Sequence, residues 1–248
     1  MSKFDSASLK KQLFLDVGNT AVKAVYKEGM AWKKVDAHSA QTGKQLILWI
    51  ENHRDDFSEI VLAGVRTEVQ QALVGELQQA DFNIKTVTNK DIPRDLLDYE
   101  TPDTLGIDRF LACYGATFQT KEAVVVIDAG TATTIDYMGR DKIFRGGVIA
   151  PGLTAFTELL PKHAPALPNV EVEIPQSWPG KSTIHSLQWG QAGFYKFALQ
   201  AMLNEYEKEF GQFDLFITGG NRQTIQQLLS MDSKLRPYLI FEGLEKLI

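Results

Sequence analysis

The chain has 248 residues, of which 44% are hydrophobic and 23% are charged, and this is typical of a globular protein with one or two domains. The formal net charge of −5 argues against a nucleic-acid-binding surface. No window approaches the roughly 20 apolar residues of a membrane helix, so we expect neither nucleic acid nor a membrane as a partner.

The single cysteine, Cys113, excludes an intramolecular disulfide and fits a reducing compartment. The short apolar run after Lys11 is interrupted by Asp16 before it could serve as the core of a signal peptide. We therefore expect no secretion signal and a cytoplasmic location.

A weak internal repeat organises the chain. The segment LFLDVGNT at residues 13–20 recurs as VVIDAGTA at residues 125–132, and a second β-prone run follows each copy, at residues 21–26 and 133–138. One Asp-x-Gly turn after a strand is also a common hairpin signal. Two copies that open two similar halves indicate related α/β domains, which we place at residues 1–118 and 119–248.

The other elements alternate between helices and strands, so both halves are predicted to be mixed α/β. In chain order we expect a helix over 42–52, a strand over 59–64, a helix over 66–81, a strand over 83–87, a helix over 106–119, a strand and turn over 144–152, a helix over 153–160, a proline-rich loop over 162–181, a long amphipathic helix over 186–210, a strand over 213–218, a turn at 219–221 and a helix over 224–229.

The first copy of the repeat could hold a phosphate. Gly18 allows close approach of the backbone, and the residues after it add hydrogen-bond donors. Asp16 is suited to Mg²⁺, directly or through water, and Lys23 could reach a phosphate as a point charge. The alternative is a polar β-turn followed by a solvated lysine.

A second motif, YETPDTLGIDR, spans residues 99–109. It places Asp108 beside Arg109 at the positive end of a helix dipole, a combination that keeps the carboxylate ionised and able to accept a proton or orient a hydroxyl. Arg109 is a candidate for holding an anionic group. The alternative is that Asp108 caps the helix and Arg109 is its ion-pair partner.

The second copy of the repeat delivers Asp128 to the end of an apolar strand, where α/β proteins usually place ligand sites. Asp128 suits a cation and Thr131 suits a phosphate. Two further glycine turns, at residues 146–152 and 217–221, provide bare backbone against which the sugar and base of a nucleotide could rest.

Other signals are absent or weak. The four histidines, His38, His53, His163 and His185, lack the spacing of metal ligands or of a catalytic triad. There is no GxxxxGK[ST] loop and no GxGxxG fingerprint, so neither P-loop nor Rossmann cofactor binding is supported.

Together these motifs resemble the type III pantothenate kinases, a family of the acetate and sugar kinase, heat-shock ATPase and actin superfamily. The resemblance spans most of the chain and rests on DVGNTAVK at 16–23, YETPDTLGIDR at 99–109, DAGTATT at 128–134, GGVIAPG at 146–152 and TGGN at 218–221. It implies two ribonuclease H-like (actin-like ATPase) domains with mixed sheets and a nucleotide cleft between them.

The resemblance implies ATP-dependent phosphorylation of pantothenate on its primary hydroxyl, the first step of coenzyme A synthesis, with Mg²⁺ and a monovalent cation (K⁺ or NH₄⁺). Asp108 is similar to the proton acceptor of the family, and Asp128 to its monovalent-cation ligand. The residues that look like ATP contacts are Asp16, Val17, Gly18, Asn19, Thr20, Ala21, Val22, Lys23 and Thr131. Those that look like pantothenate contacts are Tyr99, Gly106, Ile107, Asp108, Arg109 and Thr183, although the sequence departs from the family pattern next to Thr183, at Ser182 and Trp189.

The resemblance also implies a homodimer whose second subunit completes the pantothenate site. The long helix predicted over 186–210 is a candidate dimer surface, but its apolar positions could equally belong to the core. Two alternatives remain at this point: a non-catalytic regulatory or accessory protein of the same family, and an actin-like kinase or phosphatase that acts on a sugar or an acyl acid. Intact Asp16, Asp108, Arg109 and Asp128 favour an enzyme.

Overall fold

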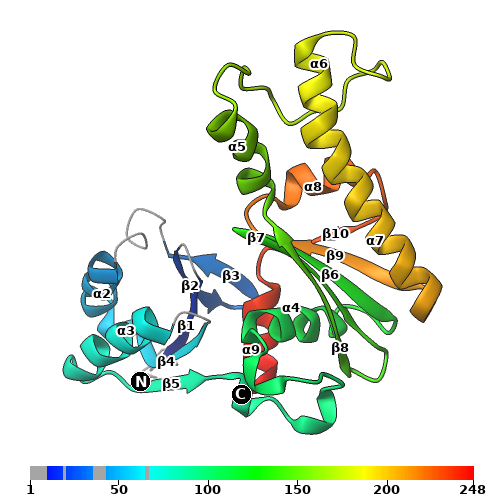
Figure 1. The fold of residues 1–248 in the computed structure, drawn as a ribbon. Coiled ribbons are helices and arrows are strands. Elements are labelled where there is room, and N and C mark those ends of the chain that lie inside the picture. The colour runs from blue at the N-terminus through cyan, green and yellow to red at the C-terminus, as the bar shows by residue number, and fades with distance from the viewer. Residues whose placement is uncertain (1–9, 19–20, 36–42, 65–66) are drawn as a thin grey trace, which may run out of the picture. The chain divides into compact units, whose positions relative to one another are not determined.

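The computed structural model describes residues 10–18, 21–35, 43–64 and 67–248. The chain divides into two compact units (Figure 1). The first unit comprises residues 1–91 and 103–108, and the second comprises residues 92–102 and 109–248. Among the described residues, no helix is both long enough and apolar enough to span a bilayer.

The first unit contains a five-stranded sheet in the order β3-β2-β1-β4-β5. Its strands are β1 (Lys11–Val17), β2 (Val22–Glu28), β3 (Ala31–Lys34), β4 (Phe57–Gly64) and β5 (Ile84–Val87). β2 runs antiparallel to β1 and to β3, whereas β4 is parallel to β1 and β5 is parallel to β4. The sheet is therefore mixed.

The second unit repeats this plan, with its five strands in the order β10-β9-β6-β7-β8. From the opposite edge the order is β8-β7-β6-β9-β10, which matches the first sheet strand for strand. The strands are β6 (Ala123–Ala129), β7 (Ala132–Met138), β8 (Phe144–Pro151), β9 (Phe213–Thr218) and β10 (Lys234–Leu235). Each pairing has the same direction as its counterpart in the first sheet. The internal repeat thus corresponds to two copies of one sheet topology, and β1 is equivalent to β6.

Helices cover the sheets because the strands alternate apolar side chains between their two faces. The first unit contains α2 (Gly43–Asn52) and α3 (Thr67–Gln79). The second contains α5 (Leu153–His163), α6 (Thr183–Gln188), α7 (Phe194–Phe210), α8 (Arg222–Leu229) and α9 (Leu239–Leu247). Helix α4 (Ile107–Thr117) begins at the last residues of the first unit and continues into the second. Leu13 and Leu15 of β1 share a buried core with α2 and α3. On one face of the second sheet, Val125 and Ile127 of β6 pack with α7 and α8.

The second unit also contains a close contact between α4 and α9 (Figure 1). A Cβ atom added at Gly115 of α4 would lie 2.3 Å from the carbonyl oxygen of Leu239, and one added at Gly243 of α9 would lie 2.0 Å from that of Leu111. Only glycine fits at such an approach. These two glycines fix the axis of α4, the helix that carries Asp108 and Arg109.

The predicted long helix over 186–210 is the main difference from expectation. The helical segment begins earlier, with α6, and a π-helical turn, Trp189–Gly193, separates α6 from α7. A Cβ atom added at Gly193 would lie 2.4 Å from Cε3 of Trp189, so the indole ring lies directly against that glycine. Among the strands and α-helices of the described residues, three had not been predicted: the short strands β3 and β10, and helix α9.

Candidate active site

In the first unit, Asp16 and Lys23 lie opposite each other in the register of β1 and β2. Lys23 Nζ is 3.5 Å from Asp16 Oδ2, and the Asp16 side chain is only 5% exposed. The turn between the strands closes with a hydrogen bond of 3.1 Å, in which Gly18 N–H donates to the carbonyl oxygen of Ala21. Two of the predicted ATP contacts, Asn19 and Thr20, lie outside the described residues.

The other predicted contacts in this motif differ in what they present to a ligand. Val17 and Val22 are buried in the core of the first unit, so their side chains are used for packing. Ala21 is exposed and Lys23 is about half exposed, at 48% of its side chain. The described part of the motif therefore offers backbone atoms, one buried carboxylate and one ammonium group.

Asp16 also interacts electrostatically with Asp108, which belongs to the same unit. Burial raises the pKa of Asp16 above its ordinary value, the positive charge of Lys23 opposes this, and the negative charge of Asp108 raises the pKa further. Asp108 occupies the first turn of α4, and its Oδ1 atom is buried. The structure thus brings together two carboxylates whose mutual repulsion a divalent cation would relieve.

In the second unit, Asp128 occupies the position on β6 that Asp16 occupies on β1, and it pairs with Thr134 and with Thr218. The turn after it closes like the first one, because Gly130 N–H donates to the carbonyl oxygen of Ala132 at 3.0 Å. Thr131, the predicted phosphate contact, is exposed in this turn.

The two other glycine motifs converge on this turn. A Cβ atom added at Gly219, which has a φ of +87°, would lie 2.5 Å from Asp128 Oδ1 and 2.5 Å from the carbonyl oxygen of Ala129. Gly152 approaches Thr131 equally closely, and its N–H donates to the Thr131 carbonyl oxygen at 3.1 Å. Glycine is required at both positions because the backbone of the turn already fills the space of a side chain.

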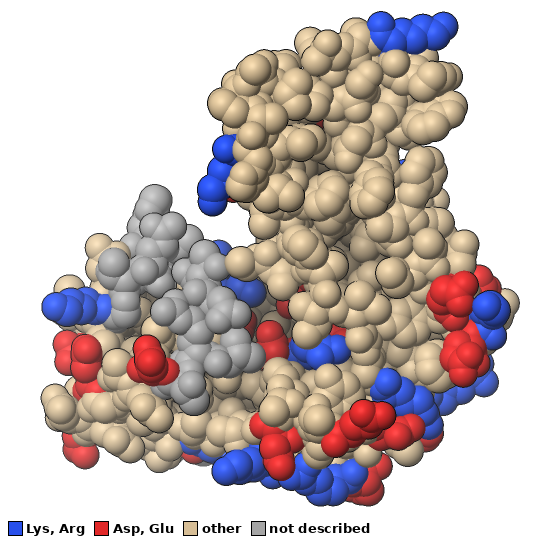
Figure 2. Space-filling view, viewed as in Figure 1, with Lys and Arg blue, Asp and Glu red and all other residues tan. Residues whose placement is uncertain are grey.

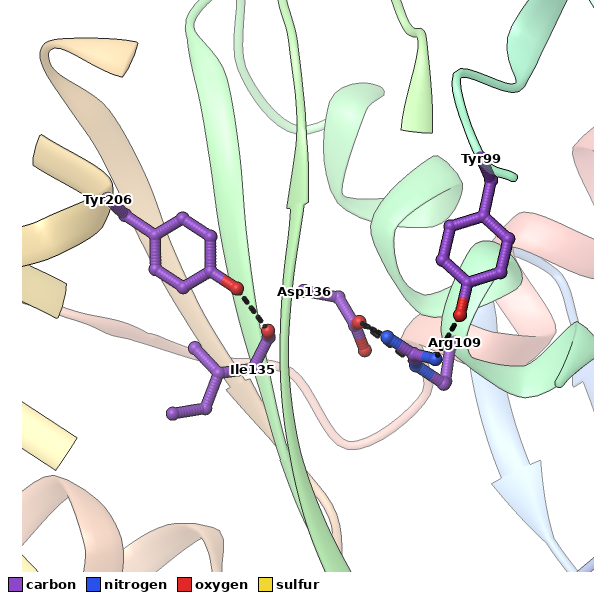
Figure 3. A network of polar contacts seen from close by, with 5 residues as sticks. All are labelled: Tyr99, Arg109, Ile135, Asp136 and Tyr206. Carbon is purple, nitrogen blue, oxygen red and sulfur yellow. Dashed lines mark hydrogen bonds and ion pairs between the residues drawn. The ribbon is translucent and has the colours of Figure 1, made fainter. Parts of the chain in front are cut away.

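Tyr99 and Arg109, two of the predicted pantothenate contacts, meet in the second unit (Figure 3). Arg109 Nη1 donates to the Tyr99 hydroxyl at 3.4 Å. The acid that pairs with the buried guanidinium is Asp136 of β7, with Nη2 to Oδ1 at 2.5 Å. Burial alone lowers the pKa of Arg109, but the hydrogen bond and charge of Asp136 outweigh this and raise it. Sequence reasoning missed Asp136, because its role depends on a partner 27 residues away.

The remaining predicted pantothenate contacts are more widely spread. Gly106 and Ile107 lie at the start of α4, and Ile107 is buried. Thr183 is the first residue of α6 and is exposed. Within the second unit, Figure 1 shows α6 far from α4, so Thr183 does not meet Arg109 within one chain.

Comparisons with known proteins first place the fold. The chain is similar to MreB5 of Spiroplasma citri, solved with ADP bound, with a TM-score of 0.50 and 9% identity over 96% of each chain. It is also similar to a conserved protein of Campylobacter jejuni named as a Baf family transcriptional activator, with a TM-score of 0.64 and 23% identity over 95% of this chain and 96% of that one. With two sheets of one topology and an aspartate at the end of each equivalent strand, the chain has the actin-like ATPase fold.

Comparisons of sequence then place the family. The family model described as type III pantothenate kinase matches residues 12–205. A type III pantothenate kinase of Flavobacterium johnsoniae is 31% identical over 218 residues, which cover 88% of each chain. The chain belongs to the type III pantothenate kinase family, as the motifs predict.

Proposed function

We propose that this chain transfers the γ-phosphoryl group of ATP to the primary hydroxyl of pantothenate, giving 4'-phosphopantothenate and ADP in the first step of coenzyme A synthesis. Membership of the family carries the reaction and the substrate. In the structure, the pair of carboxylates at Asp16 and Asp108 supports the same reaction, because phosphoryl transfer needs charge neutralisation and a group that receives the proton of the attacking hydroxyl.

In this proposal Asp108 is the general base. The hydroxyl oxygen of pantothenate forms a bond to the γ-phosphorus, the bond from that phosphorus to the β,γ-bridging oxygen breaks, and the hydroxyl proton passes to Asp108. Asp108 lies in the first turn of α4, at the electropositive end of the helix dipole.

The ATP contacts are proposed to be the turn from Asp16 to Lys23 and Thr131. Asp16 would hold Mg²⁺, which uses one or two carboxylates together with phosphate oxygens and water and which, when bound, neutralises charge on the phosphates. Lys23 supplies a positive charge on the next strand. Asp128 would hold a monovalent cation, K⁺ or NH₄⁺; its Oδ1 and the carbonyl oxygen of Ala129 both lie 2.5 Å from the position of a Cβ atom added at Gly219.

Pantothenate is proposed to contact Tyr99, the start of α4 from Gly106 to Arg109, and Thr183. Because Thr183 and Arg109 of one chain lie apart, a homodimer would let the partner subunit supply Thr183. In Figure 2, the described surface over α5, α6 and the start of α7 is mostly uncharged. The large apolar side chains exposed there are Leu159, Leu160, Ile184, Phe194, Phe197 and Met202. A patch of this kind favours a protein interface.

By the internal repeat, the two domains are taken as residues 1–118 and 119–248, although residues 92–102 and 109–118 belong to the second compact unit. The compartment is taken as the cytoplasm, to which the single reduced cysteine is suited. The regulatory alternative gains no support, because the curated relatives are named as kinases and the likeness to the Campylobacter protein concerns the fold alone.

The experiment that tests the base replaces Asp108 by Asn. Turnover should fall by a factor of about 10² to 10⁴, the usual contribution of a general base, while ATP binding measured by calorimetry stays within a few-fold of the parent. Asp55→Asn, at a fully exposed aspartate of the same unit, is the matched control and should leave turnover unchanged. Unchanged turnover in the Asp108→Asn variant would remove the assignment.

A further inference from the structure

The strand β7 carries a buried carboxylate to which no role has been assigned. The Asp136 side chain is 2% exposed, and it points at the guanidinium of Arg109, whose side chain is 7% exposed (Figure 3). We propose that Asp136 is a positioning residue of the pantothenate site, which fixes Arg109 so that its two remaining terminal N–H groups bind the carboxylate of the substrate. This inference rests on the proposed function.

The hydrogen bonds of Arg109 define this orientation. Arg109 Nε and Nη2 both donate to Asp136 Oδ1, at 3.0 and 2.5 Å, and Nη1 donates to Tyr99 at 3.4 Å. A guanidinium has five N–H donors, so these contacts among the described residues leave one donor on each terminal nitrogen. Two parallel N–H groups on Nη1 and Nη2 match the two oxygens of a carboxylate. Pantothenate carries one carboxylate as its only charged group.

Burial explains why a positioning acid is needed. A buried guanidinium without a partner is strongly unfavourable, and it would turn toward water or toward another acid. Asp136 compensates the charge through one side of the guanidinium, which leaves the opposite end for a ligand. The rings of Tyr99 and Phe144 lie 5.9 and 5.8 Å from the guanidinium carbon and restrict its movement further.

Two glycines on β8 make room for this arrangement. Gly147 stands opposite Asp136 in the strand register, and a Cβ atom there would lie 2.2 Å from Asp136 Oδ1. Gly146 has a φ of +88°, and a Cβ atom there would lie 3.2 Å from the Tyr99 ring. Any larger residue at Gly147 would displace the carboxylate. These two glycines therefore pack against the arginine network.

A hydrogen bond from α7 also fixes β7 on its opposite face. The Tyr206 hydroxyl of α7 donates to the carbonyl oxygen of Ile135 at 2.7 Å, next to Asp136 in the chain (Figure 3). The Ile135 side chain belongs to the core against which Tyr206 packs. Because successive side chains of a strand point to opposite faces, Tyr206 lies on the side of β7 away from the Asp136 carboxylate. The carboxylate of Asp136 is thus carried by a strand that is fixed on both faces.

The test is the variant Asp136→Asn, which keeps the shape and one acceptor oxygen but removes the charge. The dissociation constant for pantothenate, measured by calorimetry, and its KM should both rise about 10- to 100-fold, as expected for a weakened charge-assisted network. KM for ATP should not change. The dissociation constant and KM for pantothenol, the neutral alcohol analogue of pantothenate, should change little. The preference of the enzyme for pantothenate over pantothenol should therefore become smaller.

The matched control is Asp141→Asn, which removes an acid from another arginine pair in the same hairpin, with Arg145 Nη2 at 2.6 Å from Asp141 Oδ2. It should leave the preference for pantothenate over pantothenol unchanged. In a background of Arg109→Met, Asp136→Asn should add less than about a twofold effect on the pantothenate constants, because it acts only through Arg109.

The inference is wrong if Asp136→Asn has the same KM and dissociation constant for pantothenate as the parent and the same preference over pantothenol. It is also wrong if Asp136→Asn raises these constants as much in the Arg109→Met background as it does in the parent. If Asp136→Asn does not fold, the pair Arg109→Met with Asp136→Leu removes both charges together; a folded pair that still prefers pantothenate to pantothenol as the parent does would also overturn the inference. A parent chain that binds pantothenate without phosphorylating it would instead contradict the proposed function, and the binding constants would still test Asp136.

Discussion

Asp16 and Lys23 face each other across the first hairpin with 3.5 Å between Oδ2 and Nζ, and the equivalent pair in the second sheet is Asp128 and Thr134. One topology therefore presents an aspartate at the same strand end twice, once beside an ammonium group and once beside a hydroxyl. We therefore expect the two aspartates to hold different cations.

The buried Asp16 should cost the unliganded protein stability. Burial raises its pKa in the folded state, so the folded state is favoured while the group is protonated, and this contribution is lost as the pH rises through the folded pKa. Asp16→Asn should therefore raise the melting temperature at pH 8 without ATP or Mg²⁺. The difference in melting temperature between the variant and the parent should become smaller at lower pH, because Asp16 of the parent is then protonated. The same variant should lose turnover at least about 100-fold. A lower melting temperature for Asp16→Asn at pH 8 would contradict this.

Lys23 should act on the nucleotide. Lys23→Met removes a positive charge from the phosphate motif, and we expect KM for ATP to rise about tenfold or more while KM for pantothenate changes little. Steady-state kinetics with each substrate varied in turn measure this. Lys33→Met, at an exposed lysine of the neighbouring strand β3, is the control and should behave like the parent. Equal effects of the two variants would mean that only the net charge matters.

Asp128 should determine the response to monovalent cations. Asp128→Ala should abolish activation by K⁺, so that the variant has the same low rate in Na⁺ and K⁺ buffers. Gly219→Ala should weaken the activation as well, because the added methyl group would meet Asp128 Oδ1. Turnover measured against the concentration of KCl, with ionic strength held constant by NaCl, tests both. A parent protein with identical rates in the two salts would exclude the cation role.

The dimer should be needed for activity. In a two-fold symmetric dimer each site would combine Arg109 of one subunit with the partner's Thr183. Mixing two inactive variants, Arg109→Met and Thr183→Ala, should then restore up to about a quarter of the parent activity through mixed dimers, each with one intact site. Phe194→Glu in the exposed apolar patch should give monomers in sedimentation velocity. No restoration in a mixture shown to contain mixed dimers would place Thr183 outside the shared site.

Much of the fold was predictable because its signals are local. The repeated Asp-x-Gly turns after apolar runs predicted two related halves, and the sheets confirm them through identical strand order. The missed elements lack such signals. β3 and β10 are short strands at the edges of their sheets, and five residues of α9 are buried, so it shows little polar alternation.

The candidate site was predictable only in part. Asp16, Asp108 and Arg109 belong to sequence motifs that are continuous in the chain, whereas Asp136 acquires its role from a cross-strand glycine and from an arginine on a helix. A buried strand interior rarely holds an isolated acid, and that was the one available signal. The separation of Thr183 from Arg109 depends on tertiary structure and has no signal in the sequence.

The most direct test of the central claim is the release of ADP by the purified protein in ATP, Mg²⁺ and K⁺, with and without pantothenate, combined with mass spectrometry of the product. The account predicts ADP release that depends on pantothenate and appears together with one equivalent of 4'-phosphopantothenate. Release of ADP at the same rate without pantothenate would contradict the acceptor, and the absence of any ADP would contradict the assignment of this chain as a kinase.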